Sequence, residues 1–90
     1  MKRTEKSLEQ MLGPIPDAVR QEVDLSFAIS DRIDKLMQQR GISKSQLAVA
    51  LGRRPSEVTK WLSGQHNFTI ATLSMISAFF GQPIISVGRL

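Results

Sequence analysis

The chain has 90 residues, 41% of them hydrophobic, which allows one small domain but leaves little room for a deep catalytic cleft beside its core. It has no cysteine, which excludes disulfides, zinc ribbons and thiol nucleophiles. Its formal net charge is +4, no apolar run approaches the roughly 18 residues of a membrane-spanning helix, and the N-terminus lacks the apolar stretch of a secretory signal, so we expect a soluble cytoplasmic protein.

The positive charge is confined to the second half of the chain. Residues 1–42 carry seven basic and seven acidic residues, whereas residues 43–90 carry five basic residues against Glu57 alone. A positive charge gathered in one part of a small domain is typical of a protein that binds a polyanion. Many basic proteins gain only solubility from such a charge, so nucleic acid and no partner at all both remain open on charge alone.

The N-terminal part is predicted to be helical. Residues 1–15 form an arm or a frayed helix, closed by Gly13-Pro14. Pro16 suits the first turn of a following helix, and Gly41 is expected to end that helix in the left-handed conformation. Apolar residues recur between these points at spacings of three and four, which predicts one helical face in one long helix or in two with a break near Leu25. They are Val19, Val23, Phe27, Ile29, Ile33, Leu36 and Met37.

Two short helices are predicted back to back around Gly52, over residues 43–51 and 55–62. Ser43 and Gln46 have the spacing of a capping box, which starts the first of them. The glycine permits the tight bend of a helix-turn-helix, in which one helix lies across the phosphates and the next enters the major groove. The inner faces of the two helices are expected to consist of Leu47, Ala48, Leu51, Val58 and Leu62.

The outward face of the second short helix carries the candidate chemistry. Its Ser, Thr and Lys side chains can reach base edges, and a Thr methyl can contact a thymine methyl. Arg53 and Arg54 stand at the entrance of this helix, where phosphates would run, and Lys44 stands at the N-terminus of the preceding helix. The outward positions are Pro55, Ser56, Glu57, Thr59 and Lys60.

The end of the chain is predicted to be one more helix and a tail. Thr69 caps this helix, which runs to Gly81, and one residue of the pair Phe79-Phe80 is expected to close the core. Residues 83–90 form a short tail whose apolar, β-prone part, residues 84–87, is hard to bury in a core this small. It could pair with a second copy or with another protein.

Other residues that suggest chemistry have simpler explanations. Trp61 is expected to brace the second short helix rather than to serve as a partner hot spot. His66 stands alone in a polar loop, which favours a surface residue or a phosphate donor over a metal ligand. Asp31 and Asp34 belong to a solvated helix face on which Asp31 pairs with Lys35. We find no catalytic constellation, no metal site and no cofactor motif, so an enzyme is the least expected class.

The segment ISKSQLAVALGRRPSEVTKWLSGQHNFTIATLSMISAFFG resembles the phage-repressor/Cro helix-turn-helix family, also called the XRE family. This resemblance implies an all-α, lambda-repressor-like fold, a compact bundle of four to five helices over residues 16–82, with the N-terminal extension and the short tail on either side. The residues that carry it are Ser43, Gln46-Leu47-Ala48, Gly52, Val58, Trp61, Gly64, Thr72-Leu73 and Ile76.

The resemblance also implies roles for single residues. The residues that match the base-reading positions of the family are Pro55, Ser56, Thr59 and Lys60, and those that match its phosphate-binding positions are Ser43, Lys44, Gln65, His66 and Asn67. Two residues depart from the pattern. Arg54 stands where many relatives have a capping Ser or Thr, and Phe68 stands where Pro often follows the loop. Within the family, SEVTKWLSGQHNFTIATL is similar to antitoxins of the HigA type, which bind a toxin and repress their own operon.

Two hypotheses of different classes follow. The first is a sequence-specific repressor that binds double-stranded DNA as a homodimer, with half-sites about 34 Å apart. Such a repressor is expected to be the antitoxin of a toxin–antitoxin operon, and a free-standing regulator is the case in which no toxin gene lies beside its own. The second is a protein-interaction module that mainly neutralises a toxin, through the segment up to Phe27 and the tail. A helical bundle that has lost DNA binding is a third possibility, which the positive window around residues 44–60 argues against.

Overall fold

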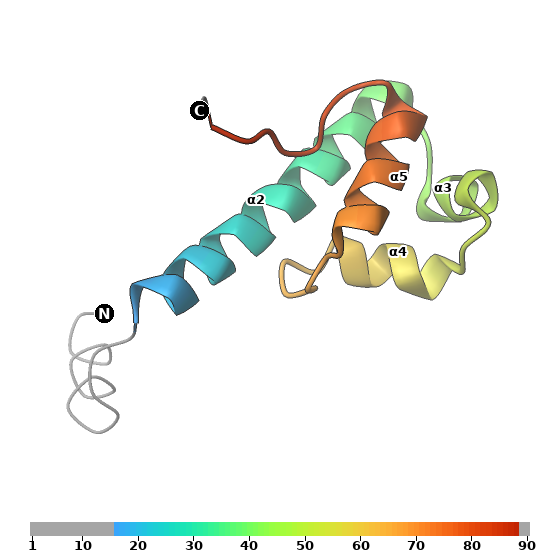
Figure 1. The fold of residues 1–90 in the computed structure, drawn as a ribbon. Helices are drawn as coiled ribbons and strands as arrows, with labels where there is room; N and C mark the ends of the chain where they lie inside the picture. The colour runs from blue at the N-terminus through green and yellow to red at the C-terminus, as the bar shows by residue number, and fades with distance from the viewer. Residues whose placement is uncertain (1–15, 89–90) are drawn as a thin grey trace.

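The computed structural model describes residues 16–88, and this part of the chain contains helices and no strand. The predicted all-α class is therefore confirmed for these residues. The predicted N-terminal arm, residues 1–15, lies outside the described residues. In chain order the helices are α2 (Asp17–Arg40), α3 (Lys44–Leu51), α4 (Pro55–Trp61) and α5 (Ile70–Phe80) (Figure 1).

Helix α2 is one continuous helix of 24 residues, without a break near Leu25. Pro16 precedes its first turn, where Asp17 lies favourably at the positive end of the helix dipole. Gly41 ends it with φ of 66°, and its N–H donates to the carbonyl oxygens of Gln38 and Met37. This left-handed conformation is open to glycine at little cost, as predicted from the sequence.

Only the C-terminal half of α2 is packed against other helices in the described part of the chain. Ile29, Ile33, Leu36 and Met37 are buried there. The N-terminal half projects beyond α4 and α5 (Figure 1), and its apolar residues stay about half exposed. The apolar residues predicted to share one face lie on one continuous helix, but the face is buried only from Ile29 onward, and Val19, Val23 and Phe27 are about half exposed.

The two short helices form as expected. The Ser43 hydroxyl accepts from the N–H of Gln46 at 3.1 Å, and the Gln46 side chain accepts from the N–H of Ser43 at 2.7 Å. This capping box satisfies backbone donors that the first turn of α3 cannot pair internally. Gly52 ends α3 with φ of 67°, and α4 begins three residues later and packs against α3.

The core lies where α5 crosses α2 and where α3 and α4 close the open side (Figure 1). Phe80 is fully buried while Phe79 is half-buried, which confirms that one of the pair closes the core. The buried apolar residues outside α2 are Leu47, Ala48, Val58, Trp61, Leu73, Ile76, Phe80 and Ile84.

The C-terminal tail is attached to the domain at its start. The Arg32 guanidinium of α2 donates to the carbonyl oxygen of Pro83 at 3.1 and 3.2 Å, and the N–H of Ile84 donates to the Ser77 hydroxyl at 3.1 Å. Ile84 therefore packs into this chain's own core, although a tail residue was expected to be hard to bury there. Ile85 and Val87 remain exposed. Within residues 16–88, no helix is long and apolar enough to cross a membrane.

Candidate nucleic-acid interface

Helix α4 presents one exposed ridge and one buried face. Val58 and Trp61 are 0% and 2% exposed, so the helix is anchored by large apolar side chains on its inner side. Positions three and four apart share a face of a helix, and the opposite face is solvent-exposed. The solvent-exposed face of α4 carries the four predicted base-reading residues, Pro55, Ser56, Thr59 and Lys60.

The hydroxyl of Thr59 already has one partner within the helix. Its Oγ1 donates to the carbonyl oxygen of Pro55 at 3.2 Å. Since the hydroxyl proton is used in this way, the oxygen is left to accept hydrogen bonds and the methyl group is free for apolar contact. Such a side chain matches an adenine or cytosine amino group, or a thymine methyl group, at a base edge.

Glu57 organises the entrance of α4, a role that its classification as an outward residue did not anticipate. Its carboxylate accepts from the N–H of Arg54 at 3.3 Å and lies 4.0 Å from the Arg53 guanidinium. Arg54 stands at the N-cap and its side chain has no acceptor for the first-turn N–H groups, so only the Glu57 half of a capping box is present, in which the carboxylate satisfies the N–H of Arg54. The Arg53 side chain also contacts the Met75 sulfur at 3.7 Å, which fixes it against α5.

The basic residues around the helix-turn-helix are exposed and mostly unpaired. Lys44, Arg53, Arg54 and Lys60 come from α3, the turn and α4. Among residues 16–88, only Arg53 of this group takes part in an ion pair, the long one with Glu57. The other three charges are available for phosphate oxygens, with which Lys and Arg form strong charge-assisted hydrogen bonds.

The remaining residues predicted to bind phosphates differ in how far other contacts within the chain hold their side chains. Ser43 is exposed, but its hydroxyl accepts the cap hydrogen bond of α3 and is held in place by it. Gln65 and Asn67 are exposed in the loop after α4. His66 is half-buried, because its ring packs edge-on against Phe68 with 4.8 Å between centroids. The loop places all three beyond the C-terminal end of α4, after Ser63.

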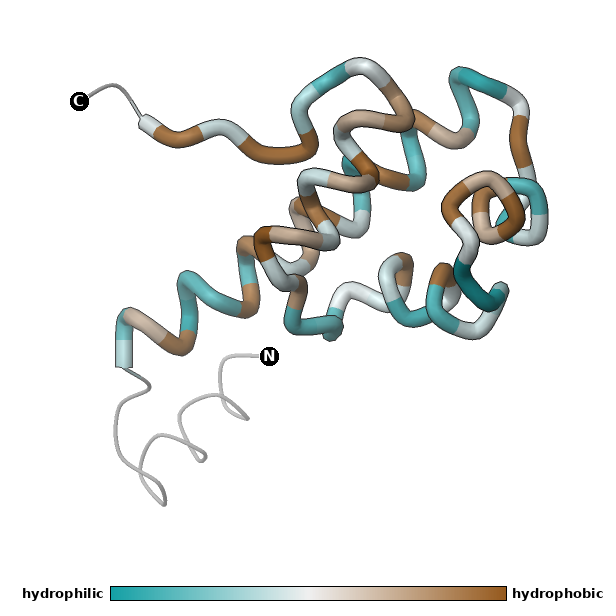
Figure 2. Tube along the Cα trace, turned by 45° about the vertical axis from the view of Figure 1, so that its right-hand side comes forward, coloured by the Kyte–Doolittle hydropathy of each residue, from teal (hydrophilic) through white to brown (hydrophobic). Residues whose placement is uncertain are grey.

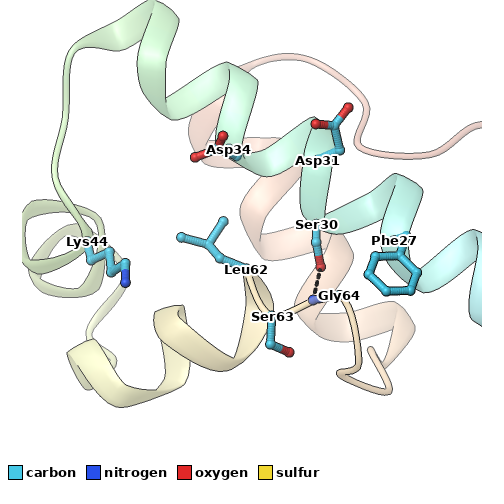
Figure 3. A pocket seen from close by; sticks show the side chains of 8 residues that line it. All are labelled: Phe27, Ser30, Asp31, Asp34, Lys44, Leu62, Ser63 and Gly64. Atoms are coloured by element: carbon cyan, nitrogen blue, oxygen red, sulfur yellow. Dashed lines mark hydrogen bonds between the residues drawn. The ribbon is translucent and has the colours of Figure 1, made fainter.

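A buried serine ties the end of α4 to α2. The Ser30 hydroxyl donates to the carbonyl oxygen of Trp61 at 2.6 Å and accepts from the N–H of Gly64 at 3.0 Å. Figure 3 shows this second bond between α2 and the loop, with Phe27 beside it. The sequence signal was a small polar residue between Ile29 and Ile33 on a buried face, but its partners are 31 and 34 positions away and were not identified.

We expect Ser30→Ala to lower the free energy of unfolding by about 1–3 kcal/mol, because it leaves the N–H of Gly64 and the carbonyl of Trp61 buried without a partner. Chemical denaturation followed by far-UV circular dichroism measures the change. Ser45→Ala, at an exposed position of α3, is the matched control and should change stability by less than about 0.5 kcal/mol. Equal effects of the two substitutions would contradict the structural role of Ser30.

Phe27 and Gly64 are packed without space between them. Gly64 is buried with φ of 83°, and a Cβ atom at this position would overlap the Phe27 ring. Both the left-handed backbone and the close contact therefore require glycine here. An open cleft of about 450 Å³ lies next to this contact, between α2 and the ends of α3 and α4 (Figure 3).

The other predictions for polar and aromatic residues can be compared with the structure. Trp61 is buried against the core, which confirms that it braces α4. Lys35 and Asp31 form the expected ion pair at 3.2 Å on an exposed face of α2. No group of three or more His, Cys, Asp or Glu side chains within residues 16–88 is arranged to hold a metal ion.

Comparison with known proteins gave one match. The family model described as helix-turn-helix matches residues 33–85, from the C-terminal third of α2 to the start of the tail. These residues include both short helices and every predicted base and phosphate contact. The comparison with curated proteins gave no match, and neither did the comparison with solved structures.

Proposed function

Because the chain belongs to the helix-turn-helix family of the phage-repressor/Cro (XRE) type, whose members are DNA-binding transcription regulators, we propose that it is a sequence-specific repressor of its own operon. It binds DNA as a homodimer, with α4 of each copy in the major groove and the two half-sites about one helical turn apart. A bound repressor excludes transcription from the promoter that its site overlaps.

The exposed ridge of α4 is the observation that carries this proposal. Pro55, Ser56, Thr59 and Lys60 share the solvent face of a helix whose other face is fixed in the core. A helix can read bases only if its outer side chains are free and its axis is held in place. Here Val58 and Trp61 hold the axis through packing, and Ser30 holds the end of the helix through hydrogen bonds.

Phosphate contacts supply register and affinity in the proposed complex. Lys44 lies in the first turn of α3, where backbone N–H groups and the helix dipole favour an anion. Arg53 and Arg54 flank the start of α4, and the loop of residues 65–67 lies at its other end, so that phosphates on both sides of the groove find donors. Ser43 borders the same site at the N-cap of α3.

We further propose that the repressor is the antitoxin of a toxin–antitoxin operon. The similarity of residues 56–73 to antitoxins of the HigA type supports this, and the exposed apolar residues of α2 and the tail offer surface for a protein partner. The alternative is a module that mainly neutralises a toxin, with DNA binding secondary or lost. The four exposed basic residues around α4 favour the repressor.

Footprinting of the purified full-length protein on the DNA upstream of its own gene tests the proposal. We expect one protected region with two halves about 34 Å apart. Co-expression of the neighbouring reading frame separates the two roles: a toxic product that the chain neutralises supports the antitoxin. No protection at any upstream site, together with neutralisation of that product, would establish the alternative instead.

We expect Lys44→Ala to weaken binding to specific and non-specific DNA by the same factor, because a phosphate contact carries no sequence information. The slope of log affinity against log salt should fall by about one for each lost contact. Fluorescence anisotropy titrations on the operator and on a scrambled duplex measure both quantities. Lys35→Ala, on an exposed face of α2 outside the proposed interface, is the matched control and should leave both affinities unchanged.

A further inference from the structure

The N-terminal half of α2 carries an apolar stripe that is only partly covered by the described part of the chain, since Gly64 packs against Phe27 at one end of it. Val19, Val23 and Phe27 are spaced by one helical turn and are 46, 47 and 54% exposed. They stand on the part of α2 that projects from the domain, where Figure 2 shows hydrophobic segments that α3, α4 and α5 do not reach. A stripe of this kind on a small domain indicates a contact with another molecule.

Charged residues beside the stripe form a pattern that complements itself. Arg20 and Asp24 lie one turn apart on the same flank of the stripe. Neither takes part in an ion pair within residues 16–88, although an i,i+4 pair could form between them. One positive and one negative charge on the same flank are the arrangement that a two-fold axis can pair with itself.

We propose that a second copy of this chain docks on the stripe, with the two α2 helices antiparallel about a two-fold axis at the level of Glu22. Arg20 and Asp24 are each two residues from this axis, so Arg20 of each copy lies level with Asp24 of the other. In this antiparallel arrangement the flank that carries Arg20 and Asp24 lies on the same side of both helices. Two reciprocal ion pairs therefore form between the copies. In one copy Val19 lies before the axis and Val23 and Phe27 lie after it, and in the other copy this order is reversed. The apolar residues of the two copies therefore alternate along the line of contact.

This interface is small. The segment Asp17 to Ala28 gives about 18 Å of helix, which buries less than the roughly 800 Å² per partner of a standard stable interface. The free dimer therefore dissociates on dilution, and two half-sites on one DNA molecule hold it together by raising the local concentration. Phe27, the last residue of the stripe, packs against Gly64, so the loop that follows α4 borders the proposed interface.

The interface specifies the homodimer of the proposed function, but it is tested without DNA. Sedimentation equilibrium of the full chain, from micromolar to near-millimolar concentration, should show a monomer–dimer equilibrium. Val23→Glu should abolish the dimer and leave the circular dichroism spectrum unchanged, since the side chain is half exposed. A monomer at every concentration, or a dimer that survives Val23→Glu, would overturn the proposal.

Charge exchange provides the sharper test. Arg20→Asp should weaken the dimer by about tenfold, because two attractions become two repulsions, and Asp24→Arg should do the same. The double variant Arg20→Asp/Asp24→Arg should restore dimerisation. Gln21→Glu, on the opposite side of α2, is the control and should change little. Failure of the double variant to recover would show that another occupant covers the stripe, such as residues 1–15 or a different protein.

A cross-link gives an independent readout, since the chain contains no cysteine. Val23→Cys should form a disulfide-linked dimer on mild oxidation, and Gln21→Cys should not. Failure of the interface and failure of the repressor are distinguishable. A protein that protects its upstream DNA but stays dimeric with Val23→Glu contradicts only the interface, whereas one that forms this dimer but protects no DNA contradicts only the repressor.

Discussion

Replacement of Trp61 by alanine should lower the free energy of unfolding by about 3–5 kcal/mol. The indole is 2% exposed at the C-terminal end of α4, within the core that α2 and α5 form. Its removal leaves a large cavity under the helix that presents the ridge. Domains of this size are stable by about 5–15 kcal/mol, so the loss takes up much of the total and weakens DNA binding through unfolding.

The stability of this variant is measured by urea denaturation followed by far-UV circular dichroism, because Trp61 is the only tryptophan and the variant has no indole fluorescence. Val49→Ala is the control: this side chain is 81% exposed, and its truncation should change stability by less than about 0.5 kcal/mol. A Trp61→Ala protein within about 1 kcal/mol of the wild type would mean that the indole does not support α4.

Binding to the operator should fall by about 10³–10⁵ between 50 and 200 mM salt. This range follows from about 6–10 phosphate contacts per dimer, each of which releases condensed counterions from the DNA. Lys44, Arg54 and Lys60 form no ion pair within the described residues, so their charges are not neutralised before DNA arrives. Arg53 contributes less, since Glu57 lies 4.0 Å from it.

Anisotropy titrations across this salt range measure the slope directly. Replacement of chloride by glutamate serves as a control for anion competition at the protein, which would otherwise add to the slope. A nearly flat dependence on salt would contradict the assignment of the basic residues around α4 to phosphates, even if the protein bound the operator tightly.

The helix boundaries were predictable because local chemistry determines them. The left-handed glycines at positions 41, 52 and 81 end α2, α3 and α5, as the sequence indicated. The capping box of Ser43 and Gln46 starts α3, and Thr69 accepts from the N–H of Thr72 at the start of α5. Each of these signals involves residues within a few positions of one another, so no knowledge of the tertiary structure is needed.

Long-range packing was less predictable, because it depends on residues that are far apart in the sequence. Periodicity identified the apolar face of α2 but not how much of it finds a partner, and Val19, Val23 and Phe27 proved exposed. The role of Ser30 was not predicted, because its partners lie 31 and 34 positions away in the sequence. Ile84 is buried in the core because Arg32 and Ser77 hold the tail by hydrogen bonds. No local sequence pattern indicates these hydrogen bonds.

The candidate site was predictable from the sequence in part. Outward positions of α4 follow from helix geometry once Val58 is known to face inward, and the structure leaves all four predicted base-reading residues exposed. The role of Glu57 at the entrance was missed because Glu57 was assigned only to the outward face of α4, although it stands three residues after the N-cap Arg54, where a carboxylate can accept from the N-cap N–H. The assignment of individual bases and phosphates remains a prediction.

Selection of binding sites from a randomised duplex pool, with the wild type, Thr59→Ala and Lys44→Ala, tests the reading of DNA by α4 most directly. Thr59→Ala should cost about 1–3 kcal/mol on the wild-type site and relax the preference at one position of each half-site. Lys44→Ala should return the wild-type motif at lower affinity. If the two variants select the same sequences with the same preferences, the ridge of α4 does not read bases.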